Sequence, residues 1–411
     1  MRGSYWFFIA ALLLIASLVW QQMPLFLISI LLFLTRGVAV LWDRYCLNRV
    51  DYRRKLSSDR VFFGEEVQLE VEISNRKPLP LPWIETDDEV PEEVTFVKGN
   101  PSPSFTGTHF LLSNLLSLNW YHKVKRRYPL RCMQRGYFRF GPARVRSGDI
   151  FGFFRREIQI QQLDHLMVYP KIVPLERLGI PSKQPVGNII ARKHIFQDPI
   201  LTAGVRDYHS GDSLKRIHWK SSARRGQLQS KVYEPTTTID LGIFLDVRTM
   251  ESQEWLKNSP LLEMVIVVAA SMANQAITEG YRVGLYANQR KKFSDELIKI
   301  PPSQHTNQMM HILEALAQIF PFETIHIDEF VRSEARNLPW GSSLVVISAM
   351  PTNNLYSTLM RIIRAGRRVS LIIVGGHEVT VSQDGLTVYH VRDDVLLTEL
   401  EMLRIEEKHH Q

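Results

Sequence analysis

The chain has 411 residues, of which 45% are hydrophobic and 22% are charged, which is the balance of an ordinary globular protein. This composition excludes intrinsic disorder, collagen and low-complexity sequence, and the length allows two or three domains with a sizeable core. The 50 lysines and arginines exceed the 42 acidic residues, so the net charge of +8 favours anionic surroundings. Two cysteines, Cys46 and Cys132, indicate neither a disulfide framework nor a cysteine-based zinc site.

The N-terminus carries two apolar runs separated by a short polar turn. Residues 5–20 contain no charge, and a second run covers residues 25–42 with Arg36 as its one interruption. Each run is near the lower limit of about 17 to 20 residues that a helix needs to cross roughly 30 Å of hydrocarbon. No small-residue cleavage site follows the first run, which argues against a signal peptide. We expect a transmembrane helical hairpin within residues 1–50.

Positive charges predict the orientation of this hairpin. Arg2 precedes the first run, and the turn between the runs contains no Lys or Arg. The basic residues that follow the second run are Arg44, Arg49, Arg53, Arg54 and Lys55. Lys and Arg accumulate on the cytoplasmic side of membrane proteins, so both ends of the hairpin should be cytoplasmic. We therefore expect a cell-membrane protein with two transmembrane helices and cytoplasmic soluble domains.

A β-rich segment is expected at residues 51–165. Apolar and polar residues alternate from Val67 to Ile73, as in a half-buried strand, and residues 75–82 are rich in turn formers. Further strands are predicted at residues 113–125, 128–133 and 136–141. Several short strands at this spacing predict an antiparallel β-sandwich. Residues 166–200 contain Pro and Gly and are expected to link this domain to the next.

Nine basic residues and no acid lie between Lys123 and Arg146. One interpretation is an anion-facing surface, which would make the protein a nucleic-acid or anionic-lipid binder. The other interpretation is that strand alternation places these side chains on a solvated face. Both alternatives stay open at the level of sequence.

The most unusual segment is RDYHSGDSLKRIHWKSSAR, from Arg206 to Arg224. Asp212, His218 and Ser222 supply the residue types of a hydrolytic triad, which keeps an uncharacterised hydrolase as an alternative. Ser222 lacks the strand-turn-helix elbow with flanking glycines that such a nucleophile uses. A structural or interaction role is favoured, with Asp212 capping the following helix and Trp219 packing on the next domain.

The C-terminal half, residues 201–411, alternates strands with helices. Apolar runs predict strands at residues 239–245, 282–287, 344–348 and 369–374, and helical spacing predicts helices at residues 256–279, 306–320 and 355–364. Residues 393–411 read as a charged amphipathic helix. This alternation is typical of a parallel sheet covered on both faces by helices.

The chain resembles the bacterial DUF58 family. The family motif is an arginine-x-tyrosine, a glycine-aspartate, a basic-isoleucine-histidine-tryptophan-lysine run and a serine-alanine-arginine. The matching positions are Arg206, Tyr208, Gly211, Asp212, Arg216, Ile217, His218, Trp219, Lys220, Ser222, Ala223 and Arg224. The resemblance extends over most of the chain, including the hairpin and the β-rich segment.

This resemblance implies a membrane-anchored protein with no settled enzymatic activity. The implied partners are a MoxR-type AAA+ ATPase and a transglutaminase-like membrane protein, and the C-terminal half is expected to be a Rossmann-like von Willebrand factor A-like α/β domain. We therefore expect a scaffold or adaptor, not an enzyme, with no evident small-molecule substrate. The motif residues would present the interaction surface.

A von Willebrand A-like domain also implies an ion site above its strand ends. That site needs an aspartate and two serines after the first strand, a threonine on a second loop and an aspartate on a third. Here Asp246 is followed by Arg248 and Met250 in place of the serines, and Thr306 is the candidate threonine. Oxygen ligands of this kind suit Mg²⁺, but the degenerate set leads us to expect no cofactor.

Overall fold

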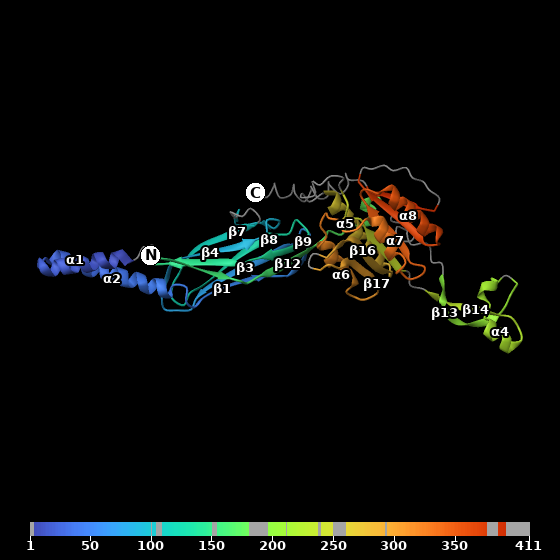
Figure 1. The fold of residues 1–411 in the computed structure, drawn as a ribbon, viewed down its shortest axis with the longest axis horizontal. Helices are drawn as coiled ribbons and strands as arrows, with labels where there is room; N and C mark the ends of the chain where they lie inside the picture. Colours follow the sequence, from blue (N-terminus) through green and yellow to red (C-terminus); the bar gives the residue numbers. More distant parts are fainter. Residues whose placement is uncertain are drawn as a thin grey trace. The chain divides into compact units, whose positions relative to one another are not determined.

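The computed structural model describes residues 4–99, 101–103, 109–149, 154–180, 196–210, 212–236, 240–249, 260–291, 294–375 and 385–391. The chain divides into two compact units, Met1–Val168 and Tyr169–Gln411 (Figure 1).

The chain begins with two apolar helices, α1 (Ser4–Val19) and α2 (Met23–Tyr45), which lie side by side (Figure 1). This confirms the expected helix pair. With 23 residues, or about 34 Å at 1.5 Å per residue, α2 is long and apolar enough to cross a membrane, whereas α1 is shorter. The helix α5 (Pro260–Thr278) has similar length and composition, but it is mostly buried in the second unit.

The rest of the first unit consists of three sheets. The four-stranded sheet has the order β1 (Val50–Leu56), β3 (Glu66–Asn75), β8 (Lys123–Arg131), β5 (Thr95–Phe96). The five-stranded sheet has the order β11 (Arg155–Ile160), β10 (Ala143–Gly148), β4 (Leu81–Val90), β7 (Phe110–Leu118), β6 (Ser102–Pro103), and the third has the order β2 (Arg60–Phe62), β12 (Asp164–Tyr169), β9 (Gly136–Phe140). Every pairing whose register is described in these sheets is antiparallel, as predicted.

One hydrophobic core holds these sheets together. Alternation in β3 buries Val67, Leu69, Val71 and Ile73 on one face, where they share a core with Ile84 of β4 and other residues of the second and third sheets. The predicted strand at residues 113–125 was wrong in one respect, because a turn interrupts it. β7 ends at Leu118 and β8 begins at Lys123, with Tyr121 at a φ of 51° between them.

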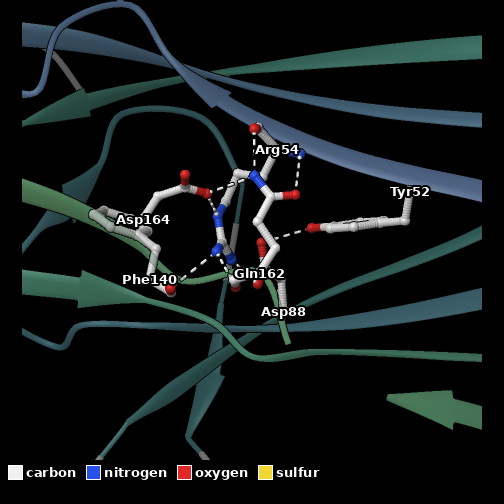
Figure 2. A network of polar contacts seen from close by, with 6 residues as sticks. All are labelled: Tyr52, Arg54, Asp88, Phe140, Gln162 and Asp164. Atoms are coloured by element: carbon white, nitrogen blue, oxygen red, sulfur yellow. Dashed lines mark hydrogen bonds and ion pairs between the residues drawn. The ribbon is translucent and has the colours of Figure 1, made fainter. Parts of the chain in front are cut away.

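A buried arginine crosses this core (Figure 2). The Arg54 guanidinium forms ion pairs with Asp88 and, at 2.8 Å, with Asp164, and it donates to two backbone carbonyls at 2.8 Å each. Burial raises the pKa of Asp88 to about 6, and the nearby guanidinium opposes that rise. The network therefore joins β1, β4, β9 and β12. Its residues are Tyr52, Arg54, Asp88, Phe140, Gln162 and Asp164.

The second unit contains a six-stranded sheet. Its order is β17 (Leu297–Ser303), β16 (Arg282–Arg290), β15 (Asp240–Leu245), β18 (Ser343–Ser348), β19 (Arg368–Val374), β20 (Thr387–Val391), and only β17 is antiparallel to its neighbour. Every residue of β15 is buried, as expected for a central strand with both faces covered. The predicted α/β region is confirmed.

Among the described residues, four helices accompany this sheet: α5, α6 (Gln308–Ala317), α7 (Ile327–Glu334) and α8 (Asn353–Arg364). The helices α7 and α8 pack on the face that carries Phe244, Val346 and Leu371, and α5 contacts several strands of the sheet. The sequence did not predict β17, α7 or β20. The expected helix at residues 393–411 and the first residues of the helix expected at 256–279 lie outside the described residues.

Candidate functional site

The motif residues form one small folded element of the second unit. The strands β13 (Phe196–Asp207) and β14 (Gln229–Thr236) pair antiparallel, with Arg206 opposite Ser230. The segment between them contains a 3-10 turn (Leu214–Arg216) and the seven-residue helix α4 (Trp219–Arg225). The helix ends at Gly226, whose φ of 70° lies in the left-handed region that glycine tolerates best.

Asp212 closes the turn that follows β13. Its Oδ1 accepts a hydrogen bond from the Arg206 guanidinium at 2.5 Å, and its Oδ2 accepts one from the His209 backbone N–H at 3.1 Å. The His209 hydrogen bond, and then the Arg206 charge, lower the pKa of Asp212. The Tyr208 hydroxyl donates to the backbone carbonyl of the same aspartate at 3.1 Å. Gly211 lies outside the described residues.

His218, rather than Asp212, caps α4, which corrects the sequence-based expectation. The His218 Nδ1 accepts a hydrogen bond from the Ser221 backbone N–H at 3.0 Å. The Ser222 hydroxyl donates to the His218 carbonyl at 3.1 Å and accepts from the Gln229 backbone N–H at 2.8 Å. Gln229 in turn donates to Asp207 at 2.5 Å. These bonds fasten α4 to β14, and Gln229 links β14 to the end of β13.

The structure does not assemble a catalytic triad from Asp212, His218 and Ser222. The Ser222 hydroxyl contacts the backbone carbonyl of His218, not its imidazole, and the side chain is buried. Asp212 is engaged by Arg206 and His209. A general base must reach the nucleophile's proton, so this arrangement lacks the geometry of nucleophilic catalysis.

Large apolar and cationic side chains of the motif are exposed instead. Trp219 is 68% exposed and Leu214 is 69% exposed, so the predicted packing of Trp219 on another domain is not observed. Residues 204–232 carry seven Lys or Arg and two Asp. We call the exposed part of the motif, together with the exposed residues just after it, the block surface. Its residues are Leu214, Lys215, Arg216, Trp219, Lys220, Arg224, Arg225 and Leu228.

Asp246 occupies the end of the central strand of the six-stranded sheet. Its Oδ1 accepts from the Arg248 backbone N–H and from the Asn288 amide, each at 3.1 Å, and its Oδ2 accepts from the Ser348 hydroxyl at 2.7 Å. Complete burial raises the pKa of Asp246 to about 6. The network joins β15, β16 and β18, and in this strand order the gap between β15 and β18 is the topological switch point where α/β sheets bind ligands.

Thr306 does not join Asp246. It is exposed before α6, whose Gln308 side chain donates to the Val283 carbonyl at 2.7 Å. Val283 is the second residue of β16, and the antiparallel strand β17 returns the chain to that end, whereas Asp246 lies at the other end of the sheet. Thr306 and Asp246 therefore do not fit a shared Mg²⁺ ion. The described residues contain no group of three or more His, Cys, Asp or Glu side chains suited to a metal. Met250 lies outside them.

A hollow of about 440 Å³ lies near the end of β16 and was not predicted. It is lined by Arg290, Lys291, Phe320, Phe322 and Thr324, and the two phenylalanine rings stack with their centroids 6.5 Å apart. Phe320 was expected to be the last residue of the helix at residues 306–320, but α6 ends at Ala317, so both rings lie in the irregular segment between α6 and α7.

The basic stretch from Lys123 to Arg146 is largely neutralised by neighbouring strands. On β8, Lys125 pairs with Glu70 at 2.6 Å and Arg127 pairs with the same carboxylate at 2.9 Å. Lys123 pairs with Glu72 at 2.6 Å. These acids lie on β3, which pairs with β8, so the sequence of the basic stretch alone could not predict these ion pairs.

Comparison with known proteins identifies the region around the motif. Residues 204–402 match the model of the family described as "Protein of unknown function DUF58". The uncharacterized protein YeaD of Bacillus subtilis (strain 168) is 24% identical over 344 residues, which cover 82% of this chain and 79% of that protein. The resemblance inferred from the motif is thereby confirmed.

Solved structures are similar to a smaller part of the chain. The CARDB domain of the PF1109 protein from Pyrococcus furiosus has a TM-score of 0.19 and 12% identity, and the match covers 29% of this chain and 93% of that one. A cohesin module of a family 33 glycoside hydrolase from Clostridium perfringens has a TM-score of 0.21 and 13% identity, and the match covers 29% and 96%, respectively.

Proposed function

We propose that this chain, whose residues 204–402 belong to the DUF58 family, is a membrane-anchored scaffold or adaptor that binds another protein through the block surface. One observation carries the proposal. The polar motif residues Asp212, His218 and Ser222 are consumed by hydrogen bonds within the motif, whereas Trp219 and its basic neighbours face outward. The polar groups of the motif thus stabilise its fold, and its apolar and cationic side chains are left exposed for contact with a partner.

A rigid surface of this composition suits protein recognition. Binding energy in protein interfaces concentrates in a few residues, among which Trp and Arg are enriched. The two strands, the His218 cap and the Ser222 link hold α4 in place, so little conformational entropy is lost when Trp219 is buried by a partner. The protein would act without catalysing a reaction.

The location proposed for this adaptor is the cell membrane, with α1 and α2 as the anchor and both soluble units in the cytoplasm. The support is the apolar character of the helix pair and the positive charges that follow α2. By resemblance to the family, the partners would be a MoxR-type AAA+ ATPase and a transglutaminase-like membrane protein. The strand order of the second unit, with an antiparallel edge strand, supports a von Willebrand A-like domain.

A membrane-preserving pull-down tests the proposal. The full-length protein is compared with a Trp219→Ala variant, and a Trp340→Ala variant serves as the control because Trp340 is similarly exposed outside the motif. We expect the wild type and the control to retain the same partner proteins, and the Trp219→Ala variant to lose at least one of them by about tenfold or more, as truncation of a tryptophan hot spot does. Equal recovery from all three proteins would contradict the proposed role of the block surface.

A further inference from the structure

The end of α2 is fastened to one end of the β-sheets in the first unit. The Trp42 indole N–H donates to the Pro80 carbonyl at 3.1 Å. The buried Lys77 ammonium donates to the carbonyls of Cys46 at 2.6 Å and Asn48 at 2.8 Å. These bonds tie the last turn of α2 and the residues after it to the loop between β3 and β4, so this end of the sheets is fixed beside the apolar helix.

The turn between β7 and β8 lies at the same end. The Tyr121 backbone N–H donates to the Lys77 carbonyl at 3.3 Å. The Asn75 side chain donates to the Asn119 carbonyl at 2.9 Å, and the Asn75 backbone N–H donates to the His122 carbonyl at 2.9 Å. Residues 119–122 therefore continue the surface formed by the end of α2 and the β3–β4 loop. We call this surface the anchor face, made of residues 42–51, 75–80 and 119–123.

Two large aromatic side chains on the anchor face are open to their surroundings. Trp120 is 67% exposed and Tyr121 is 70% exposed. Tyr121 also adopts a φ of 51°, a backbone conformation that a bulky residue rarely takes. Asn and Asp adopt that conformation more easily than a bulky aromatic residue does, so Tyr121 is held there at a local cost.

The anchor face is also cationic. Arg44 and Arg49 are exposed on it. Arg76 pairs with Asp51 at 2.8 Å, Lys123 pairs with Glu72 at 2.6 Å, and Lys77 is buried. Trp and Tyr concentrate at the boundary between hydrocarbon and water, and juxtamembrane Lys and Arg are attracted to anionic headgroups. The anchor face combines both residue classes at the point where an apolar helix ends.

We propose that the anchor face is a lipid-contact surface, with Trp120 and Tyr121 lying in the headgroup region of the same bilayer that α2 enters. Anionic lipids face the exposed Arg44 and Arg49. This inference rests on the proposed membrane anchoring. The bonds from Trp42 and Lys77 favour a bilayer over a protein as the occupant, because they hold this turn next to the end of the apolar helix. The first unit would then contact the membrane through the anchor face as well as through its helices.

Depth-dependent fluorescence quenching tests this inference on the full-length protein reconstituted in phosphatidylcholine vesicles, with and without phosphatidylglycerol. The quencher is a lipid brominated near the headgroup end of its acyl chains. Trp120→Phe removes one of eight tryptophans, and Trp340→Phe is the matched control. We expect Trp120→Phe to lower the fraction of fluorescence that the brominated lipid quenches, and to do so more strongly when the anionic lipid is present. The control should leave that fraction unchanged or raise it.

The experiment distinguishes failure of the lipid-contact inference from failure of the proposed membrane anchoring. If the wild type and the Trp120→Phe variant are quenched to the same extent by brominated lipid, and aqueous iodide instead quenches the Trp120 contribution, then the anchor face is in water and the inference is wrong. A protein partner on that face would give protection from both quenchers, which also overturns it. If the wild type fails to float with the vesicles after an alkaline wash, membrane anchoring itself is wrong.

Discussion

Two buried charged residues, Arg54 and Asp246, are each held by several partners. Arg54 is almost fully buried, and its guanidinium reaches two carboxylates and two backbone carbonyls. Asp246 is buried at the end of β15 and accepts three hydrogen bonds. The cost of removing such groups from water is offset only when their partners stay in place. Both sites should therefore respond strongly to the loss of one partner.

Replacing Arg54 by Met should destabilise the first unit by about 3–5 kcal/mol, because Asp88 would stay buried without its cation. The control is Arg53→Met on the same strand, where the side chain is exposed and the change should cost less than about 0.5 kcal/mol. Urea denaturation of the two variants beside the wild type measures the difference. A similar, small effect of both substitutions would mean that the network in Figure 2 contributes little to stability.

The raised pKa of Asp246 predicts how stability depends on pH. The folded-state pKa is about 6 and the ordinary value is 3.8, so the folded protein binds this proton more tightly than the unfolded chain does. The contribution of Asp246 to stability is therefore largest at low pH and falls as the pH rises from about 4 to about 6. Between pH 5 and pH 7 the change should be about 1 kcal/mol.

The comparison with an Asp246→Asn variant isolates this effect, because the amide does not titrate. Free energies of unfolding are measured for both proteins at pH 5 and pH 7. We expect the wild type to lose more stability than the variant on going to pH 7. A parallel change in the two proteins would show that Asp246 is ionised at both pH values in the folded state.

At the scale of the secondary-structure elements, antiparallel pairing decides whether the basic residues of residues 123–146 are neutralised by acids. Register places Glu70 opposite Arg127 and Glu72 opposite Lys125, so strand β3 supplies the acids that β8 lacks. The sequence predicted β3 from its alternation but gave no information on which strand lies beside it, because pairing is a long-range property. The ion pairs that neutralise the basic stretch were unpredictable for the same reason. The position of Thr306 was also unpredictable, because the antiparallel strand β17 places it at the end of the sheet far from Asp246.

Neutralising Glu70 and Glu72 should leave the basic residues of β8 available to bind anions. In a Glu70→Gln, Glu72→Gln double variant, Lys123, Lys125 and Arg127 lose their partners. We expect the affinity for duplex DNA at low salt to increase and its salt dependence to steepen relative to the wild type. Exposed ion pairs contribute about 0–1 kcal/mol each, so the fold should survive.

Glu92→Gln with Glu93→Gln is the matched control, because it removes the same charge from an exposed turn. DNA affinity is measured for the three proteins across a salt series. If the wild type already binds DNA as tightly and with the same salt dependence as the Glu70→Gln, Glu72→Gln variant, the ion pairs do not mask the stretch and the nucleic-acid alternative gains support.

At the scale of the whole molecule, local periodicity predicted the order of the parts: an apolar helix pair, a β-rich segment and an α/β region. The motif was also visible in the sequence, because no secondary-structure periodicity accounts for its composition. The hydrogen bonds within the motif could not be predicted from the sequence. Which of Asp212, His218 and Ser222 would bond to backbone groups depends on the pairing of β13 with β14, and the exposure of Trp219 depends on that same pairing.

We propose that the helix pair holds both soluble units on the cytoplasmic face of a membrane, where the block surface meets a partner. Protease protection of the full-length protein in membrane vesicles of the two opposite orientations tests it most directly. We predict that segments after α2 are digested in inside-out vesicles and protected in right-side-out ones. Digestion of these segments in right-side-out vesicles, or release of the intact chain from the membrane by alkaline washing, would contradict the account.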